Sequence, residues 1–153
     1  MNLYEAGHLA RELMRRHGLL GQGWTFSFDH ARRRFGCCHY HTKRITLSRP
    51  LTFLNAIDEV RDTVLHEIAH ALTPGDGHGR KWRAKCAQIG ATPRRCYKDE
   101  EIVAPPRAAA KYLLGCEACG WWVERRRRSR RKYVCKRCSG SVEYRARPRV
   151  LTS

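Results

Sequence analysis

The sequence predicts an α+β fold in two parts, and three observations predict it. Apolar residues recur at helical spacing over residues 3–20 and 54–72. Between these segments, residues 24–28 and 35–48 have the composition and alternation of β-strands. Towards the C-terminus, two Cys-x-x-Cys pairs flank a short strand-like stretch. We therefore expect a mixed domain of helices and a short sheet, followed by a small β module held by its cysteines.

The first segment, residues 3–20, is expected to be an amphipathic helix that packs on the core and ends at Gly18 and Gly21. The apolar side chains on or near one of its faces are Leu3, Leu9, Leu13, Met14 and Leu20. A turn at residues 29–31 then separates the strand 24–28 from residues 35–48, which hold a second strand and room for a third.

The strand expected at residues 43–48 precedes the second long helix and has two possible uses. It could pair with an extended peptide through main-chain hydrogen bonds, or it could be solvated or paired within the protein. His39 and His41 are expected to alternate along one strand face. They could bind phosphate or substrate, or they could be surface histidines without a role.

The second long helix, residues 54–72, carries the sequence His66-Glu67-Ile68-Ala69-His70. Residues four apart share a helix face, so His66 and His70 can bind one zinc ion while Glu67 points at a water molecule. The alternative is that both are core histidines. An apolar stripe is expected to face the core, formed by Ile57, Val60, Val64, Ile68 and Ala71.

A third ligand is expected directly after this helix, because a catalytic zinc takes three protein ligands and leaves a position for water. Residues 74–77, Pro-Gly-Asp-Gly, end the helix, and His78 follows at once. His78 is the expected third ligand; the alternative is that it merely begins a helix at residues 80–89, capped by Gly90.

The charge of the chain is unusual: 31 Lys and Arg against 14 Asp and Glu give +17 and a pI near 10.2. We place a domain boundary near Val103, within a short linker expected at residues 100–110. Residues 1–103 carry 17 basic and 11 acidic side chains, and residues 104–153 carry 14 and 3. The resulting net charges, +6 and +11, predict a polyanionic partner such as nucleic acid, and less readily a membrane surface, bound mainly by residues 104–153.

Four cysteines in residues 104–153 form two knuckles, with fifteen residues between the inner pair: Cys116, Cys119, Cys135 and Cys138. This spacing predicts a closed tetrahedral structural zinc site, with disulfides as the alternative. So short a segment cannot bury a sufficient core, so zinc binding would supply its folding energy. The remaining cysteines, Cys37, Cys38, Cys86 and Cys96, lack ligand spacing and are expected to be buried or half-buried side chains.

Between the knuckles, two strand-like arms flank a basic turn that we expect to bind nucleic acid; the alternative is a solvated loop. Adjacent strand residues point to opposite faces, so one tryptophan is expected in the core and the other on a base. The expected nucleic-acid contacts are Trp121, Trp122, Arg125, Arg126, Arg127, Arg128, Arg130, Arg131, Lys132 and Tyr133.

These motifs together resemble the SprT-like zinc metalloprotease family, which includes the Spartan proteases that clear DNA–protein crosslinks. The resemblance is carried by His66 to His70, the glycine-rich turn, His78-Gly79, Trp82 and the four-cysteine ribbon, and more loosely by the strands at 24–28, 34–37 and 44–48. It implies a small zincin-like domain at 1–103, a DNA-binding zinc ribbon at 104–153, and protein substrates on single-stranded or disrupted DNA.

The sequence thus predicts two zinc ions, one catalytic and one structural, with Glu67 as the general base. An oxyanion donor is also expected, with Tyr97 and Arg94 as candidates. Two alternatives remain: a non-enzymatic zinc-ribbon DNA-binding protein, and a general peptidase localised on RNA. No apolar run approaches the roughly 18 residues of a membrane-spanning helix and no signal peptide is evident, so we expect an intracellular monomer, cytoplasmic or nucleoid-associated, or nuclear in a eukaryote.

Overall fold

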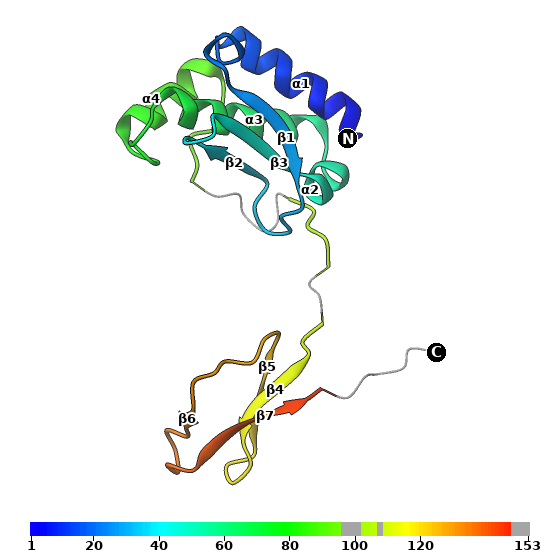
Figure 1. The fold of residues 1–153 in the computed structure, drawn as a ribbon, viewed down its shortest axis with the longest axis vertical. Coiled ribbons are helices and arrows are strands. Elements are labelled where there is room, and N and C mark those ends of the chain that lie inside the picture. The colour runs from blue at the N-terminus through cyan, green and yellow to red at the C-terminus, as the bar shows by residue number, and fades with distance from the viewer. Residues whose placement is uncertain (96–101, 107–108, 148–153) are drawn as a thin grey trace. The chain divides into compact units, whose positions relative to one another are not determined.

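The structure, a computed structural model, describes residues 1–95, 102–106 and 109–147. The chain divides into two compact units, Met1–Pro105 and Pro106–Ser153, each with its own sheet (Figure 1). The first unit contains α1 (Leu3–Arg16), the 3-10 helix η1 (Leu20–Gln22), β1 (Thr25–Asp29), β2 (Gly36–His39), β3 (Arg44–Ser48), α2 (Arg49–Leu54), α3 (Ile57–Leu72) and α4 (Arg80–Ile89). The second contains β4 (Tyr112–Cys116), β5 (Trp121–Arg125), β6 (Tyr133–Val134) and β7 (Ser141–Ala146). The predicted α+β fold class is confirmed.

Helix α1 is shorter than the sequence suggested. The Asn2 side chain accepts a hydrogen bond from the Glu5 backbone N–H at 2.8 Å and so caps the first turn. The helix ends at Arg16, and Gly18 follows with φ of 72°, which favours glycine. Leu19, beyond the helix, is fully buried, so the chain turns back to the core before η1 begins.

The first sheet has the order β1-β3-β2, with β3 parallel to β1 and antiparallel to β2. Helices α1 and α3 pack on one face of it (Figure 1). Because β3 is paired on both sides, the suggestion that residues 43–48 pair with a peptide substrate is wrong; β2 forms the sheet edge that packs against α3. His41 lies in the turn after β2, so it does not alternate with His39 along a strand.

The helix expected at residues 54–72 is α3, which starts three residues later than expected, and the separate short helix α2 precedes it. Ser48 caps α2 by accepting from the Leu51 N–H at 3.2 Å, and Asn55 then breaks the helix with an extended backbone. The Asn55 amide donates to the Leu51 carbonyl at 2.7 Å and to the Val103 carbonyl at 2.8 Å. Helix α3 therefore starts at Ile57, whose side chain is 55% exposed, so its expected place in the core is wrong.

The interior of α3 agrees with the apolar periodicity of the sequence. Val60, Val64 and Ile68 are fully buried, and Ala71 is partly buried against the same core. Helix α4 begins at Arg80 and ends at Ile89, where Gly90 takes the left-handed conformation with φ of 78°. The two helices pack together, and this fixes the loop between them, residues 73–79.

The second unit is a sheet of order β5-β4-β7-β6. Strand β5 pairs with β4, whereas β6 pairs with β7, so the two arms that flank the basic segment are not partners in one hairpin. The basic segment, residues 126–132, instead connects strands at opposite edges of the sheet.

Three of the four cysteines outside the knuckles lie as expected: Cys37 and Cys38 are half-buried and Cys86 is buried. Cys96 falls outside the described residues. Among the helices of the described ranges, none has the length and apolar character needed to span a bilayer.

Candidate metal centres and active site

Three imidazoles converge at the C-terminal end of α3. His66 and His70 project from successive turns, and His78 comes from the loop before α4. The Nε2 atoms are 3.3 Å apart for His66 and His70, 3.1 Å for His70 and His78, and 3.3 Å for His66 and His78. Nitrogen ligands at about 2.0–2.1 Å from a tetrahedral zinc ion are about 3.3 Å apart, so the three residues fit this metal.

The loop that carries His78 is fixed by Asp76. Its carboxylate accepts a hydrogen bond from the Trp82 backbone N–H at 2.8 Å, and its carbonyl accepts from the Gly79 N–H at 2.9 Å. A negative carboxylate in this place also suits the first turn of α4. A Cβ atom at Gly79 would lie 2.8 Å from the Asp76 carboxylate oxygens, so the close turn requires glycine there.

The ring of Trp82 packs against the three imidazoles. Its centroid lies 4.8 Å from that of His66, 5.2 Å from that of His70 and 4.6 Å from that of His78, and the residue is fully buried. Contacts of this kind restrict the rotation of the imidazoles and hold their Nε2 atoms together. Only the family resemblance drew attention to Trp82 in the sequence.

The electrostatic environment keeps the imidazoles neutral. Burial, and then the neighbouring His70 and His78, lower the pKa of His66 to about 4. Burial likewise lowers the pKa of His70 to about 4. For His78 the pKa is lowered by burial and then by the positive charges of Arg95 and Arg83. Neutral imidazole is the form that binds metal.

Glu67 lies beside the histidines in an apolar setting, with 7% of its surface exposed. Burial raises its pKa to about 8, while the charge of Arg34 and a hydrogen bond from the Cys38 backbone N–H act in the opposite direction. The edge strand β2 thus touches the carboxylate directly. A Cβ atom at Gly36 would lie 2.7 Å from Glu67 Oε1 and 2.9 Å from Thr63 Cγ2, so glycine permits this approach. In the sequence, Gly36 stood out only as part of the strand at 34–37, which loosely resembles the family.

Tyr40, just after β2, is a second residue at this site that the sequence did not indicate. Its hydroxyl donates to the His70 backbone carbonyl at 3.2 Å. Of the two residues expected as oxyanion donors, Tyr97 falls outside the described residues. Arg94 lies within the described residues, next to Arg95, whose positive charge lowers the pKa of His78.

The four knuckle cysteines also converge. The Sγ atoms of Cys116 and Cys138 are 3.5 Å apart and those of Cys119 and Cys135 are 3.8 Å apart, with all four within 4.8 Å of one another. Thiolates at about 2.3 Å from a tetrahedral zinc ion are about 3.8 Å apart, so the cluster fits a structural zinc. The Trp121 indole N–H donates to Cys135 Sγ at 3.3 Å and is the main cause that lowers the Cys135 pKa to about 6.

The expected nucleic-acid contacts fall into two groups. Trp121 faces the cysteine cluster, whereas Trp122 lies against Gly115 with the Arg145 guanidinium 4.5 Å from its ring centroid. Arg128 lies over the Tyr112 and Tyr144 rings, at 5.4 and 6.0 Å, and donates to the Tyr144 carbonyl at 3.3 Å. Arg128 is nevertheless exposed, as are the other expected contacts: Arg125, Arg126, Arg127, Arg130, Arg131, Lys132 and Tyr133.

Comparison with known proteins places this site in a family. The model of the SprT-like family matches residues 8–101, which include the three histidines and Glu67. Protein SprT of Pseudomonas putida strain W619 is 28% identical over 137 residues, covering 81% of this chain and 82% of that protein. Protein SprT of Actinobacillus succinogenes is 24% identical over 127 residues, covering 78% of this chain and 75% of that protein.

A eukaryotic relative is also similar. The germ cell nuclear acidic-1 protein of Caenorhabditis elegans is 29% identical over 126 residues, covering 71% of this chain and 22% of that protein. No solved structure gives a significant match. The family match suggests a metalloprotease-type function, in keeping with the two clusters that could hold metal ions. With its match over more than half of the sequence, the chain belongs to the SprT-like family.

Proposed function

We propose that the protein is a zinc-dependent endopeptidase that binds DNA and cleaves proteins bound or crosslinked to that DNA. The observation that carries the proposal is the meeting of three neutral imidazoles, 3.1–3.3 Å apart at Nε2, with the buried carboxylate of Glu67. Three ligands and an adjacent base are the composition of a catalytic zinc site, whereas a structural site takes four ligands.

The residues of the first unit divide the work of peptide hydrolysis. When bound by His66, His70 and His78, zinc would polarise the scissile carbonyl and lower the pKa of a water molecule. Glu67 takes the proton of the attacking water and passes it to the leaving amine. Its burial makes the carboxylate a stronger base than an exposed one, and the Cys38 N–H holds it in place.

A peptide substrate would reach this site along β2. This strand is an edge of the first sheet and contacts Glu67 through Gly36 and Cys38. An extended peptide can add to such an edge through main-chain hydrogen bonds, which are indifferent to side chains. Recognition of this kind suits an enzyme that must cleave whatever protein is attached to DNA.

The second unit would bind the DNA. Its exposed basic loop suits the phosphates, and the charge of residues 104–153 is +11 from 14 basic and 3 acidic side chains. Trp122, on the sheet face opposite the one that carries Trp121, could stack on a base if Arg145 moved aside. Such stacking favours single-stranded or disrupted DNA.

The decisive experiment compares the zinc-loaded protein with Glu67→Gln on a DNA-bound protein, with and without single-stranded DNA. We expect DNA-stimulated cleavage by the parent, and a loss of roughly hundredfold or more in the variant because the general base is gone. Zinc content and DNA affinity should be equal in the two proteins. Undiminished cleavage by the variant would refute the mechanism, and cleavage that is indifferent to DNA would refute the recruitment.

A further inference from the structure

Tyr40 lies beside the proposed active site, in contact with the backbone of His70. It follows β2, the strand that touches Glu67, and it lies in the turn that leads to β3. Its hydroxyl donates to the His70 carbonyl at 3.2 Å, so the ring lies against the turn of α3 that carries a zinc-binding histidine. The residue is 39% exposed, which leaves it accessible to a bound peptide.

The hydrogen bond that Tyr40 makes is weak enough to be exchanged. Its length, 3.2 Å, exceeds the usual range of about 2.5–3.0 Å for O–H···O bonds. The acceptor is also a carbonyl near the end of α3, where the Thr73 backbone N–H already donates to it at 3.1 Å. Release of the hydroxyl therefore leaves the His70 carbonyl with a partner.

We infer that the Tyr40 hydroxyl is the oxyanion donor of this site. When the peptide carbonyl is attacked, its oxygen gains a full negative charge, and a hydroxyl that donates to this oxygen stabilises the transition state. Tyr40 would exchange the His70 carbonyl for the substrate oxygen and return afterwards. Tyr40 donates a hydrogen bond and keeps its proton, so the proton transfer from water to the leaving amine is carried out by Glu67 alone.

Other groups near the site are less suited to this role. The Arg34 guanidinium is engaged by the Asp29 carboxylate at 2.6 Å and would lose that ion pair on moving. The Cys38 N–H is used by Glu67. Tyr40 combines an exchangeable donor with a position at the end of the strand where a peptide would lie.

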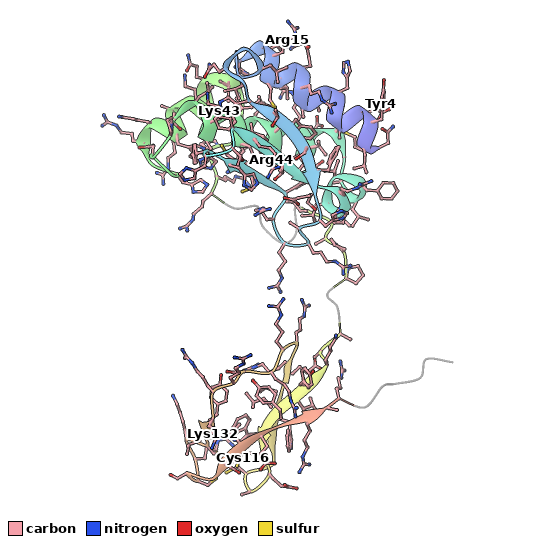
Figure 2. The ribbon with its side chains drawn as sticks, viewed as in Figure 1. Tyr4, Arg15, Lys43, Arg44, Cys116 and Lys132 are labelled. Carbon is pink, nitrogen blue, oxygen red and sulfur yellow. The ribbon has the colours of Figure 1, made fainter. Side chains whose placement is uncertain are left out.

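The inference rests on the proposed peptidase function, so its test includes a measurement that needs no turnover. Tyr40→Phe removes only the hydroxyl, and Tyr4→Phe is the matched control, because Tyr4 is 85% exposed on the first turn of α1 (Figure 2). Both zinc-loaded variants are titrated with a peptide phosphonamidate, which mimics the tetrahedral anion, and with a peptide hydroxamate, which binds zinc without that shape. Zinc content and thermal unfolding are measured alongside.

We expect Tyr40→Phe to bind the phosphonamidate roughly tenfold more weakly or worse while it keeps the hydroxamate, since one hydrogen bond to a charged oxygen is lost. Its kcat should fall roughly 10- to 100-fold with KM nearly unchanged. Tyr4→Phe should match the parent in every measurement. Equal losses for both inhibitors, or a loss of zinc, would make Tyr40 a structural anchor of the turn and overturn the inference. Unchanged phosphonamidate affinity would also overturn it, whereas failure of the parent to cleave any protein would refute the proposed function alone.

Discussion

The ionised form of Glu67 that catalysis requires lowers the stability of the metal-free protein. Its pKa is raised by burial to about 8 from an ordinary 4.5, so the folded state holds a proton that the unfolded chain releases between these values. The stability conferred by the neutral form is complete below about pH 4.5 and is lost as the pH rises towards 8. The ionised carboxylate needed for catalysis thus destabilises the metal-free fold near neutral pH.

We therefore predict that Glu67→Gln stabilises the metal-free protein at about pH 7.5, by roughly 1–3 kcal/mol, because glutamine stays neutral. At about pH 4 the two proteins should unfold alike. Urea unfolding at both pH values, in the presence of a chelator, measures the difference. A variant no more stable than the parent at the higher pH would show that Glu67 is not desolvated.

Trp121 contacts the cysteine cluster, so its substitution is expected to change zinc binding. Its indole N–H donates to Cys135 Sγ and lowers the pKa of that thiol. We predict that Trp121→Phe weakens zinc binding at the cysteine cluster roughly 10- to 100-fold, the usual cost of losing a group that supports a ligand. Competition with a chromophoric chelator gives the affinity, and Trp122→Phe is the control, because its ring contacts Arg145 instead.

At the scale of elements, the close contact between β2 and α3 depends on Gly36, which has no side chain. A methyl group at Gly36 would meet Glu67 and Thr63 at 2.7–2.9 Å, so the strand or the helix would have to move. We predict that Gly36→Ala costs roughly 1–3 kcal/mol of stability and lowers proteolysis more than zinc content. Gly21→Ala is the control, since a Cβ there has nothing within 4 Å. Unfolding curves, cleavage rates and elemental analysis separate these effects.

The four arginines at residues 125–128, the last three of them in the basic segment, differ in their contacts. Arg125, Arg126, Arg127 and Arg128 are all exposed, and Arg128 in addition lies over the Tyr112 and Tyr144 rings. If Arg125, Arg126 and Arg127 contact phosphates, their replacement by Ser should flatten the log–log salt dependence of single-stranded DNA binding by about two units, at about 0.7 per contact. Arg128→Ser should instead destabilise the second unit and change the slope little. Salt titrations of DNA binding and thermal unfolding of both variants test this prediction. Equal salt slopes for the two variants would show that Arg128 does not differ from the other three arginines in its role.

How far the sequence predicts these elements depends on how local the determining interactions are. The pairing of His66 with His70 and the cysteine knuckles rest on spacings within one turn or one loop, and the structure brings both sets together. The break at Asn55 rests on hydrogen bonds to Val103, 48 residues away, which no periodicity reveals. The central place of β3 and the separation of β5 from β6 depend on strand order, and alternation within a strand says nothing of its neighbours.

Over the whole molecule, stability is divided unequally between the two units. The first has a core that draws on all four of its α-helices and its sheet. In the described part of the second unit, the buried apolar side chains are Leu114, Cys116 and Cys135, two of which belong to the metal cluster. Apolar burial on this scale cannot offset the entropy of ordering the chain, so the second unit should depend on zinc for its fold.

The second unit has the smaller apolar core, and residues 104–153 carry a net charge of +11 against +6 for residues 1–103. Loss of the structural zinc should therefore affect DNA binding more than the chemistry of cleavage. Cys119→Ser combined with Cys138→Ser should leave one zinc ion per chain and unfold the second unit only, so that hydrogen exchange becomes fast in residues 112–146 and stays slow in α1 and α3. Cleavage of an unstructured protein should persist, because the three histidines and Glu67 are untouched. Cleavage of a DNA-bound protein should fall with the lost affinity for DNA. His78→Ala is the complement: it should also leave one zinc ion, keep DNA binding, and abolish cleavage of both substrates. If the double cysteine variant kept full activity on the DNA-bound protein, the first unit would be the one that binds DNA.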